Sequence, residues 1–226
     1  MWTVRGNVDV GTLLMVSCAL IVAGIAIEPR LKRSSSSVEE HPLKRDVWNK
    51  ISQGGHRNGS ATAPVQLVVF TDYQCPACSR FEPKLTALLA MQRDDVSVVY
   101  RNFPISSIHR DAVAAALAAE CAAEQGGFEA MRESLYRHQP LIGTKSWEWF
   151  FQNAALSDTS RFNACMTAMR YRQTIAEDST VGQQIGVRGT PTIVVNGRVL
   201  TGTLSSEELN RQVRRHKRDK AAYSGR

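Results

Sequence analysis

The segment Val65 to Leu85, VQLVVFTDYQCPACSRFEPKL, decides the fold, because it joins a buried strand to a helix that begins with two cysteines. Its opening residues, VQLVVF, are a nearly continuous apolar run, which is typical of a strand buried on both faces of a sheet. Residues 75–91 have the apolar spacing of an amphipathic helix. The sequence therefore places Cys75-Pro76-Ala77-Cys78 in the first turn of a helix.

A cysteine pair at the start of a helix is suited to redox chemistry. Free backbone N–H groups and the positive end of the helix dipole stabilise the thiolate of the first cysteine. Pro76 fits this turn, because its φ is already helical and its missing N–H is not needed there. We therefore expect a lowered pKa for Cys75, which makes it the nucleophile and a good leaving group, with Cys78 as the resolving thiol.

The alternative for this motif is half of a structural zinc site. Such a site needs four ligands, and the sequence holds no second close pair of Cys or His. We therefore predict redox chemistry by the two thiols themselves, with no metal and no cofactor.

Two further features accompany the dithiol. Gly189-Thr190-Pro191 precedes the strand-like stretch TIVVNG, and a long region without strand signals separates it from the cysteines. Together with FTDYQCPACSRF, they resemble the thioredoxin superfamily, and within it the DsbA-like branch, over residues 62–215. Gln74 departs from thioredoxins and dedicated reductases, which usually have Trp before the first cysteine. The resemblance implies an α/β thioredoxin fold with a helical insertion, and thiol:disulfide oxidoreductase activity.

The periodicity of the remaining chain predicts the same order of elements. Val65–Phe70 and Val96–Arg101 are predicted strands around the helix Cys75–Met91, a βαβ unit with parallel strands. An all-helical insert follows at 106–187, then a hairpin with an Asn-Gly turn and a helix opened by the capping box Ser205–Glu208. The predicted helices of the insert are Asp111–Gln125, Phe128–His138, one capped by Ser146, Arg161–Met169 and Tyr171–Ile185. We predict a domain over residues 64–216 and a basic tail at 217–226.

Several residues are candidates for tuning the dithiol. The resemblance gives Glu82, one helical turn after Cys78, the role of accepting the Cys78 proton through water; the alternative is a surface Glu without a role. Asp72 either shapes the loop before the helix, raises the thiol pKa by repulsion, or simply ends the strand. His109 resembles a structural His of relatives. Pro76 and Ala77, between the cysteines, contribute to the redox potential.

Thr190 and Pro191 are the predicted substrate-binding residues. The resemblance implies a cis bond between them, which would turn the preceding N–H and C=O outward to pair with an extended substrate. The alternative is an ordinary trans-Pro at the start of a strand.

Cys121 and Cys165 form the second cysteine feature, on separate helices of the insert. In an oxidising compartment two remaining thiols most often pair, and many DsbA-like relatives carry such a clamp. The alternative is a pair of free core cysteines, which a cytoplasmic location would favour.

The N-terminal third carries signals of a different kind. Val10–Ile27 is an uncharged apolar run of 18 residues, which predicts an uncleaved membrane anchor over residues 1–28. Lipidation of Cys18 is an alternative that the apolar residues after it disfavour. Residues 29–63, with four consecutive serines, read as a flexible linker, although residues 46–51 (DVWNKI) also suit a helical turn or a membrane contact through Trp48.

The distribution of charge restricts the partners and bears on topology. The net charge is +7, but the excess lies in the two terminal segments, and residues 62–209 are near neutral, so we predict no nucleic-acid binding. Arg30, Lys32 and Arg33 follow the apolar run, and the positive-inside rule alone would place the domain in the cytoplasm. The cysteine pattern and the resemblance favour the extracytoplasmic, periplasmic side, which we adopt.

We therefore predict a membrane-anchored thiol:disulfide oxidoreductase that donates disulfides to extended, thiol-containing proteins of the envelope or to secreted ones. The resemblance implies reoxidation by a quinone-linked membrane partner. We expect a monomer. An isomerase is disfavoured, because no separate dimerisation domain precedes the fold. A reductase of the same fold is the alternative within this class, and a non-enzymatic module that grips extended clients is the alternative outside it.

Overall fold

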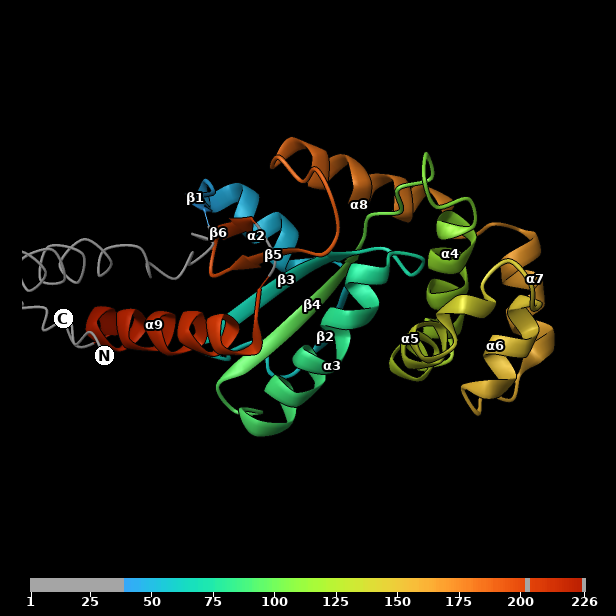
Figure 1. The fold of residues 1–226 in the computed structure, drawn as a ribbon, viewed down its shortest axis with the longest axis horizontal. Helices are drawn as coiled ribbons and strands as arrows, with labels where there is room; N and C mark the ends of the chain where they lie inside the picture. Colours follow the sequence, from blue (N-terminus) through green and yellow to red (C-terminus); the bar gives the residue numbers. More distant parts are fainter. Residues whose placement is uncertain (1–38, 202–203, 225–226) are drawn as a thin grey trace, which may run out of the picture. The chain divides into compact units, whose positions relative to one another are not determined.

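The computed structural model describes residues 39–201 and 204–224, and Figure 1 shows how their helices and strands are arranged. The predicted membrane anchor at residues 1–28 and the first part of the predicted linker lie outside these residues. Within 39–201 and 204–224, none of the helices is both long enough and apolar enough to cross a membrane.

A six-stranded mixed sheet lies at the centre of the fold, in the order β1-β6-β5-β3-β4-β2. Strands β3 and β4 are parallel, with Val65 opposite Val96 and Thr71 opposite Asn102, and the other neighbouring pairs are antiparallel. The strands are β1 (Glu39–Pro42), β2 (His56–Asn58), β3 (Val65–Thr71), β4 (Val96–Asn102), β5 (Thr192–Val195) and β6 (Arg198–Thr201). The predicted parallel βαβ unit is confirmed.

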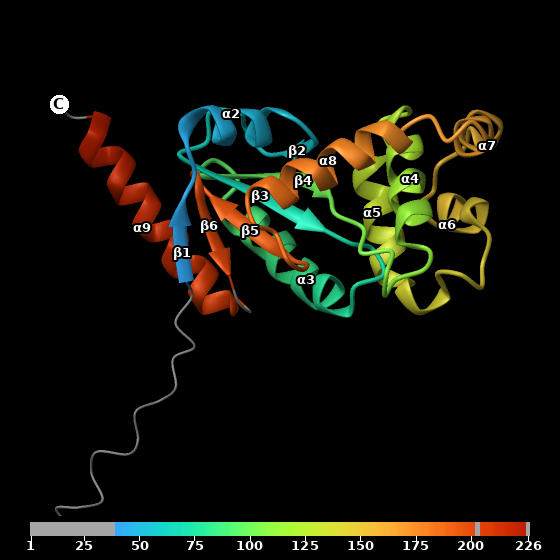
Figure 2. The same cartoon turned by 90° about the horizontal axis from the view of Figure 1, so that it is seen from above.

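Helices cover both faces of this sheet (Figure 2). Leu67 and Val69 of β3 belong to the core that the sheet shares with α3, α9 and the helices of the insert, whereas Val68 and Phe70 belong to the core shared with α2 and α8. The helices are α2 (Arg45–Gln53), α3 (Pro76–Met91), α4 (Ala112–Ala123), α5 (Phe128–Arg137), η1 (Gln139–Leu141), α6 (Trp147–Asn153), α7 (Thr159–Thr167), α8 (Arg172–Gln184) and α9 (Ser206–Ser224). Burial on both faces explains why β3 is apolar at nearly every position.

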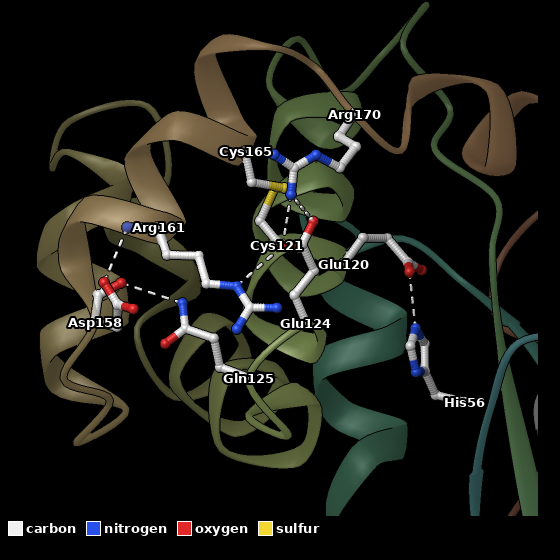
Figure 3. The surroundings of a disulfide bond; sticks show 9 residues. All are labelled: His56, Glu120, Cys121, Glu124, Gln125, Asp158, Arg161, Cys165 and Arg170. Carbon is white, nitrogen blue, oxygen red and sulfur yellow. Dashed lines mark hydrogen bonds and ion pairs between the residues drawn. A yellow bond between two sulfur atoms is a disulfide. The ribbon is translucent and has the colours of Figure 1, made fainter.

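Five α-helices, α4 to α8, and the short η1 follow β4 and precede β5. Cys121 on α4 and Cys165 on α7 form the predicted disulfide, and both residues are fully buried. Arg161 and Arg170 both pair with Glu124, which lies one turn after Cys121 (Figure 3). The disulfide closes a loop of 44 residues, and by the chain-entropy estimate this contributes about 4 kcal/mol to stability. A covalent and an ionic link therefore hold α4 against the segment of α7.

The predicted local signals at element ends are confirmed. Helix α3 begins at Pro76 with Cys75 as its N-cap, and Ser146 caps α6 by accepting a hydrogen bond from the backbone N–H of Trp149 at 3.2 Å. The hairpin between β5 and β6 turns at Asn196 and Gly197, whose φ values of 45° and 83° are those that a type I′ turn needs.

The prediction of a flexible linker is wrong for residues 39–58. This stretch forms β1, α2 and β2, which place a strand at each edge of the sheet. Ile51 of α2 is fully buried against Val68 and neighbouring apolar side chains, and Trp48 packs on the same cluster. Edge strands this short are held mainly by backbone hydrogen bonds, which any polar sequence can make, so their composition resembles that of a linker.

The predicted tail from residue 217 also differs from the structure. Helix α9 continues to Ser224, and Lys217 forms an ion pair with Asp95 in the loop before β4. The start of this basic segment is therefore part of a helix that is anchored to the domain.

Candidate active site

The two cysteines of the dithiol lie where a strand gives way to a helix. Cys75 is the N-cap of α3 with extended backbone angles, and Cys78 follows within the first turn. Both are free thiols, and they are 8% and 2% exposed, respectively. One sulfur thus lies near the surface, and the other lies beneath it in the core.

The environment shifts the pKa values of the two thiols in opposite directions. The pKa of Cys75 is lowered to about 5, first because the Cys78 thiol donates a hydrogen bond to it, and further by the backbone N–H groups of Cys78 and Ala77. Burial acts against this shift but does not cancel it. Burial raises the pKa of Cys78 far above its ordinary value, and its hydrogen bond to Cys75 adds to the shift. At neutral pH the pair therefore holds one thiolate, on Cys75, and one proton, on Cys78.

The loop before β5 comes to the dithiol from more than a hundred residues away. The Thr190–Pro191 peptide bond is cis, as predicted. The Cys75 thiol, when protonated, donates to the carbonyl oxygen of Thr190 at 3.2 Å, and the Thr192 hydroxyl donates to the Gly189 carbonyl at 2.7 Å. The fold therefore brings together both predicted sites, the dithiol and the Thr190-Pro191 pair.

Asp72 fixes the loop that leads from β3 to Cys75. Its buried carboxylate accepts hydrogen bonds from the backbone N–H groups of Gln74 and Ile105, both at 2.8 Å. His109 Nδ1 lies 2.8 Å from the same carboxylate. These contacts favour a loop-shaping role for Asp72 and a structural role for His109 over repulsion of the thiol.

Glu82 is buried one turn after Cys78, which disagrees with the alternative of a surface residue. Its carboxylate forms an ion pair with Arg132 of α5 and accepts a hydrogen bond from the Thr86 hydroxyl at 3.3 Å. Arg132 is itself buried and lies over the ring of Tyr100, 4.5 Å from its centroid. A buried carboxylate requires such a partner. The role of Glu82 as proton acceptor stays a proposal.

Sequence reasoning missed the residues of the insert that hold the dithiol loop. Gln139 of η1 donates to the carbonyl oxygens of Tyr73 and Cys75, at 2.7 and 3.0 Å. The hydroxyl groups of Thr71 and Tyr136 lie 2.5 Å apart. These contacts span more than sixty residues, and nothing in a single sequence marks an isolated Gln or Tyr as their partner.

The fold and the buried dithiol define a dithiol protein of the thioredoxin type. A sequence model of the thioredoxin family matches residues 52–215, and the chain belongs to this family. A probable disulfide bond formation protein D of Bacillus cereus is 26% identical over 151 residues, which cover 62% of this chain and 68% of that protein.

Curated relatives of a different name match the same region. The chain is 35% identical over 158 residues to a protein named Na(+)/H(+) antiporter NhaA 3 of Salinispora tropica, over 70% of this chain. The match covers 24% of that protein, so this chain spans about a quarter of the antiporter's length.

Solved structures confirm the predicted thioredoxin-like α/β fold. A thioredoxin-like oxidoreductase from Silicibacter pomeroyi superposes with a TM-score of 0.65 at 26% identity, covering 78% of this chain and 99% of that one. Oxidised BdbD from Bacillus subtilis also gives 0.65, at 21% identity over 74% of this chain and 94% of that one. The second match is evidence for the fold alone.

The thiolate assignment predicts how the reduced protein reacts with iodoacetamide. Alkylation of Cys75 should rise with a midpoint near pH 5, because only the thiolate reacts, whereas Cys78 should stay almost unmodified up to pH 8. Mass spectrometry of the digested protein locates the modified residue and gives the midpoint.

Two controls sharpen this measurement. Cys78→Ala removes the largest cause of the shift and should move the Cys75 midpoint upward, and protein unfolded in guanidinium should show about 8.5. A midpoint near 8.5 in the folded parent would contradict the activated thiolate.

Proposed function

We propose that this protein is a thiol:disulfide oxidoreductase, with Cys75 and Cys78 as the catalytic pair. The observation that carries the proposal is the placement of two free thiols in one helical turn, Cys75 at the N-cap beside the Thr190 carbonyl and Cys78 in the core, which shifts their pKa values in opposite directions. Thioredoxin-type exchange needs a first sulfur that attacks and leaves as a thiolate, and a second that holds its proton.

The oxidative reaction begins with the disulfide between Cys75 and Cys78. A substrate thiolate attacks Cys75 Sγ, which forms a mixed disulfide and leaves the electron pair on Cys78. Because the pKa of Cys78 is raised, this sulfur takes up a proton from water. In the reverse reaction, when Cys78 attacks the mixed disulfide, we propose that Glu82 accepts this proton through a water molecule. A second substrate thiolate then attacks the substrate's own sulfur in the mixed disulfide, and Cys75 leaves as the thiolate. The substrate loses two electrons and the enzyme gains them.

Thr190 and Pro191 are proposed to bind the substrate beside the reacting sulfur. They line a cavity next to α3, and the Thr190 carbonyl lies within hydrogen-bond distance of Cys75 Sγ. An extended peptide can pair with the backbone of this loop as an added strand, and this places its cysteine against Cys75.

The direction we propose is oxidation of protein thiols. A thiolate that is stable at neutral pH favours the reduced form of the enzyme, and an enzyme with a stable reduced form is an oxidant. We propose a quinone-linked membrane protein as the reoxidant and a monomer as the working state. The competing functions are a reductase and a client-binding module whose dithiol is only structural.

Trapping separates an enzyme from a binding module. In the variant Cys78→Ala the mixed disulfide cannot be resolved by the second thiol, so protein partners should accumulate on Cys75. Non-reducing electrophoresis of the cell envelope should show adducts that disappear with reductant, and Cys75→Ala/Cys78→Ala should show none. Absence of adducts in the single variant would favour the binding module.

The redox potential separates an oxidase from a reductase. Equilibration with glutathione buffers should give a value above the roughly −270 mV of thioredoxin, because the pKa of Cys75 lies about two units below that of the thioredoxin thiol. Reduction takes up one proton above pH 5 and two below it. The potential should therefore fall by about 30 mV per pH unit between pH 5 and 8, and by about 59 mV per unit below pH 5. A potential at or below that of thioredoxin would favour the reductase.

We further propose that residues 1–28 anchor the domain on the extracytoplasmic side of a membrane. The apolar run Val10–Ile27 and the buried Cys121–Cys165 disulfide support this placement, since structural disulfides persist in oxidising compartments. By the positive-inside rule, the three cations after this run favour a cytoplasmic domain. Large domains often override this rule, so we give it less weight than the disulfide.

Topology can be tested with a reporter that is active only outside the cytoplasm. Fused after Arg226, it should be active, and mass spectrometry without reduction should find Cys121 linked to Cys165 in protein from growing cells. The same fusion with Val10–Ile27 deleted is the control and should be silent. A silent full-length fusion with both thiols free would instead favour a reductase on the cytoplasmic side.

A further inference from the structure

A cavity of about 710 Å³ opens beside the dithiol, between α3 and the loop that carries Thr190. Ala77, which separates the cysteines, belongs to its wall, and so does Thr190, whose carbonyl oxygen is 3.2 Å from Cys75 Sγ. A substrate whose sulfur reacts with Cys75 therefore has its neighbouring residues at the mouth of this cavity.

The cavity has an apolar floor and a positively charged rim. Phe81 and Leu204 are buried beneath it. Arg80, Lys84 and Arg188 also line it, and no acidic side chain is among its lining residues in the described part of the chain. The residues that line the cavity would therefore receive a negative group without like-charge repulsion.

Two of these cations are free to bind a ligand. Lys84 donates to the Leu204 carbonyl at 2.9 Å, whereas Arg80 and Arg188 are exposed and make no hydrogen bond or ion pair with any residue in the described ranges. Several arginines elsewhere in the domain do pair with acidic residues; examples are Arg101 with Asp178, Arg132 with Glu82 and Arg170 with Glu124. Two exposed arginines that have no acidic partner in the described ranges thus lie together at the mouth of the candidate active site.

We infer that the preferred substrates carry an acidic side chain, Asp or Glu, two residues from the cysteine that reacts with Cys75. This rests on the proposed function and adds a substrate class to it. In an extended chain, residues two apart point to the same side and lie about 7 Å from each other. When the substrate cysteine points to Cys75, the residue two positions away points to the cavity, where its carboxylate meets Arg80 and Arg188.

The experiment uses the full-length protein in detergent, oxidised at Cys75 and Cys78, and peptides that differ at one position. The residue two before or two after a single cysteine is Glu, Gln or Lys, and the rate of mixed-disulfide formation is measured against peptide concentration. Each rate is divided by the rate at which the same peptide reacts with a small uncharged disulfide compound. This is needed because a neighbouring carboxylate changes the reactivity of the peptide thiol itself. We expect the Glu peptide of at least one position to react about three to ten times faster than the Gln peptide, and Lys to be slowest. The preference should shrink as salt is raised.

Matched variants assign the preference to the two arginines. In Arg80→Gln/Arg188→Gln the ratio of Glu to Gln should fall to about one, and Arg80→Glu/Arg188→Glu should favour the Lys peptide. Arg214→Gln, an exposed change on α9, removes a charge elsewhere and should leave the ratio unchanged. The iodoacetamide profile of each variant shows whether Cys75 keeps its pKa.

The outcomes distinguish this inference from the function on which it rests. If the parent reacts with all peptides at equal normalised rates, or if the ratio survives in Arg80→Gln/Arg188→Gln, the acidic preference is wrong and the oxidoreductase stands. If the parent reacts with none of the peptides, the proposed function fails, and the inference fails with it.

Discussion

The hydrogen bond between the Cys78 thiol and the Cys75 thiolate is the interaction on which the rest of the site depends. Two chemically identical groups in one helical turn would share their protons if their surroundings were alike. Burial raises the pKa of Cys78, whereas the hydrogen bond from Cys78 and the N–H groups of the helix N-terminus lower the pKa of Cys75. The separation gives each sulfur one role, because the first can attack and leave while the second keeps the proton. The strand-to-helix junction creates this difference, since it puts one sulfur at the helix mouth and the other in the core.

The helical insert supplies much of the support for this junction. Gln139 and Tyr136 reach back to the residues around Cys75, and Arg132 pairs with Glu82 below Cys78. These contacts require α5 and η1 to keep their place at the end of the sheet. On the far side, the disulfide and the Glu124 ion pairs hold α4 to α7.

A polar network also ties α4 to the sheet. His56 of β2 lies 2.8 Å from Glu120, which also accepts a hydrogen bond from Asn102 at the end of β4, at 2.6 Å (Figure 3 shows the first of these contacts). Asn102 in turn contacts Asp178 of α8, and this carboxylate pairs with Arg101. The buried charges of this network are paired, which is the condition for keeping them in a core. The disulfide thus joins two helices within the insert, whereas this polar network joins the insert to the sheet.

The sequence predicts those parts of the fold whose causes are local. The apolar run of β3, the Asn196-Gly197 turn and the capping residues Ser146 and Ser205 each act within a few residues, and each prediction is confirmed. Residues 39–58 were predicted wrongly because β1 and β2 depend on backbone pairing with β6 and β4, far along the chain. Arg132 and Gln139 could not be predicted for the same reason. Their roles exist only once the insert has folded against the dithiol.

The region that matches the relatives makes up different shares of their chains. In the antiporter-named protein of Salinispora tropica the matching region is about a quarter of the chain, whereas it covers most of the Bacillus cereus protein. We therefore ask whether the contacts of the dithiol in this chain lie within the shared region. The described contacts of the dithiol do lie within it. Asp72, Glu82, Arg132, Gln139 and Thr190 all lie within the family match at residues 52–215, and β2, which reaches α4 through His56, lies within it too. Strand β1 lies before this match and pairs only with β6 in the described sheet, so β6 and β5 separate it from β3, the strand that leads to the dithiol.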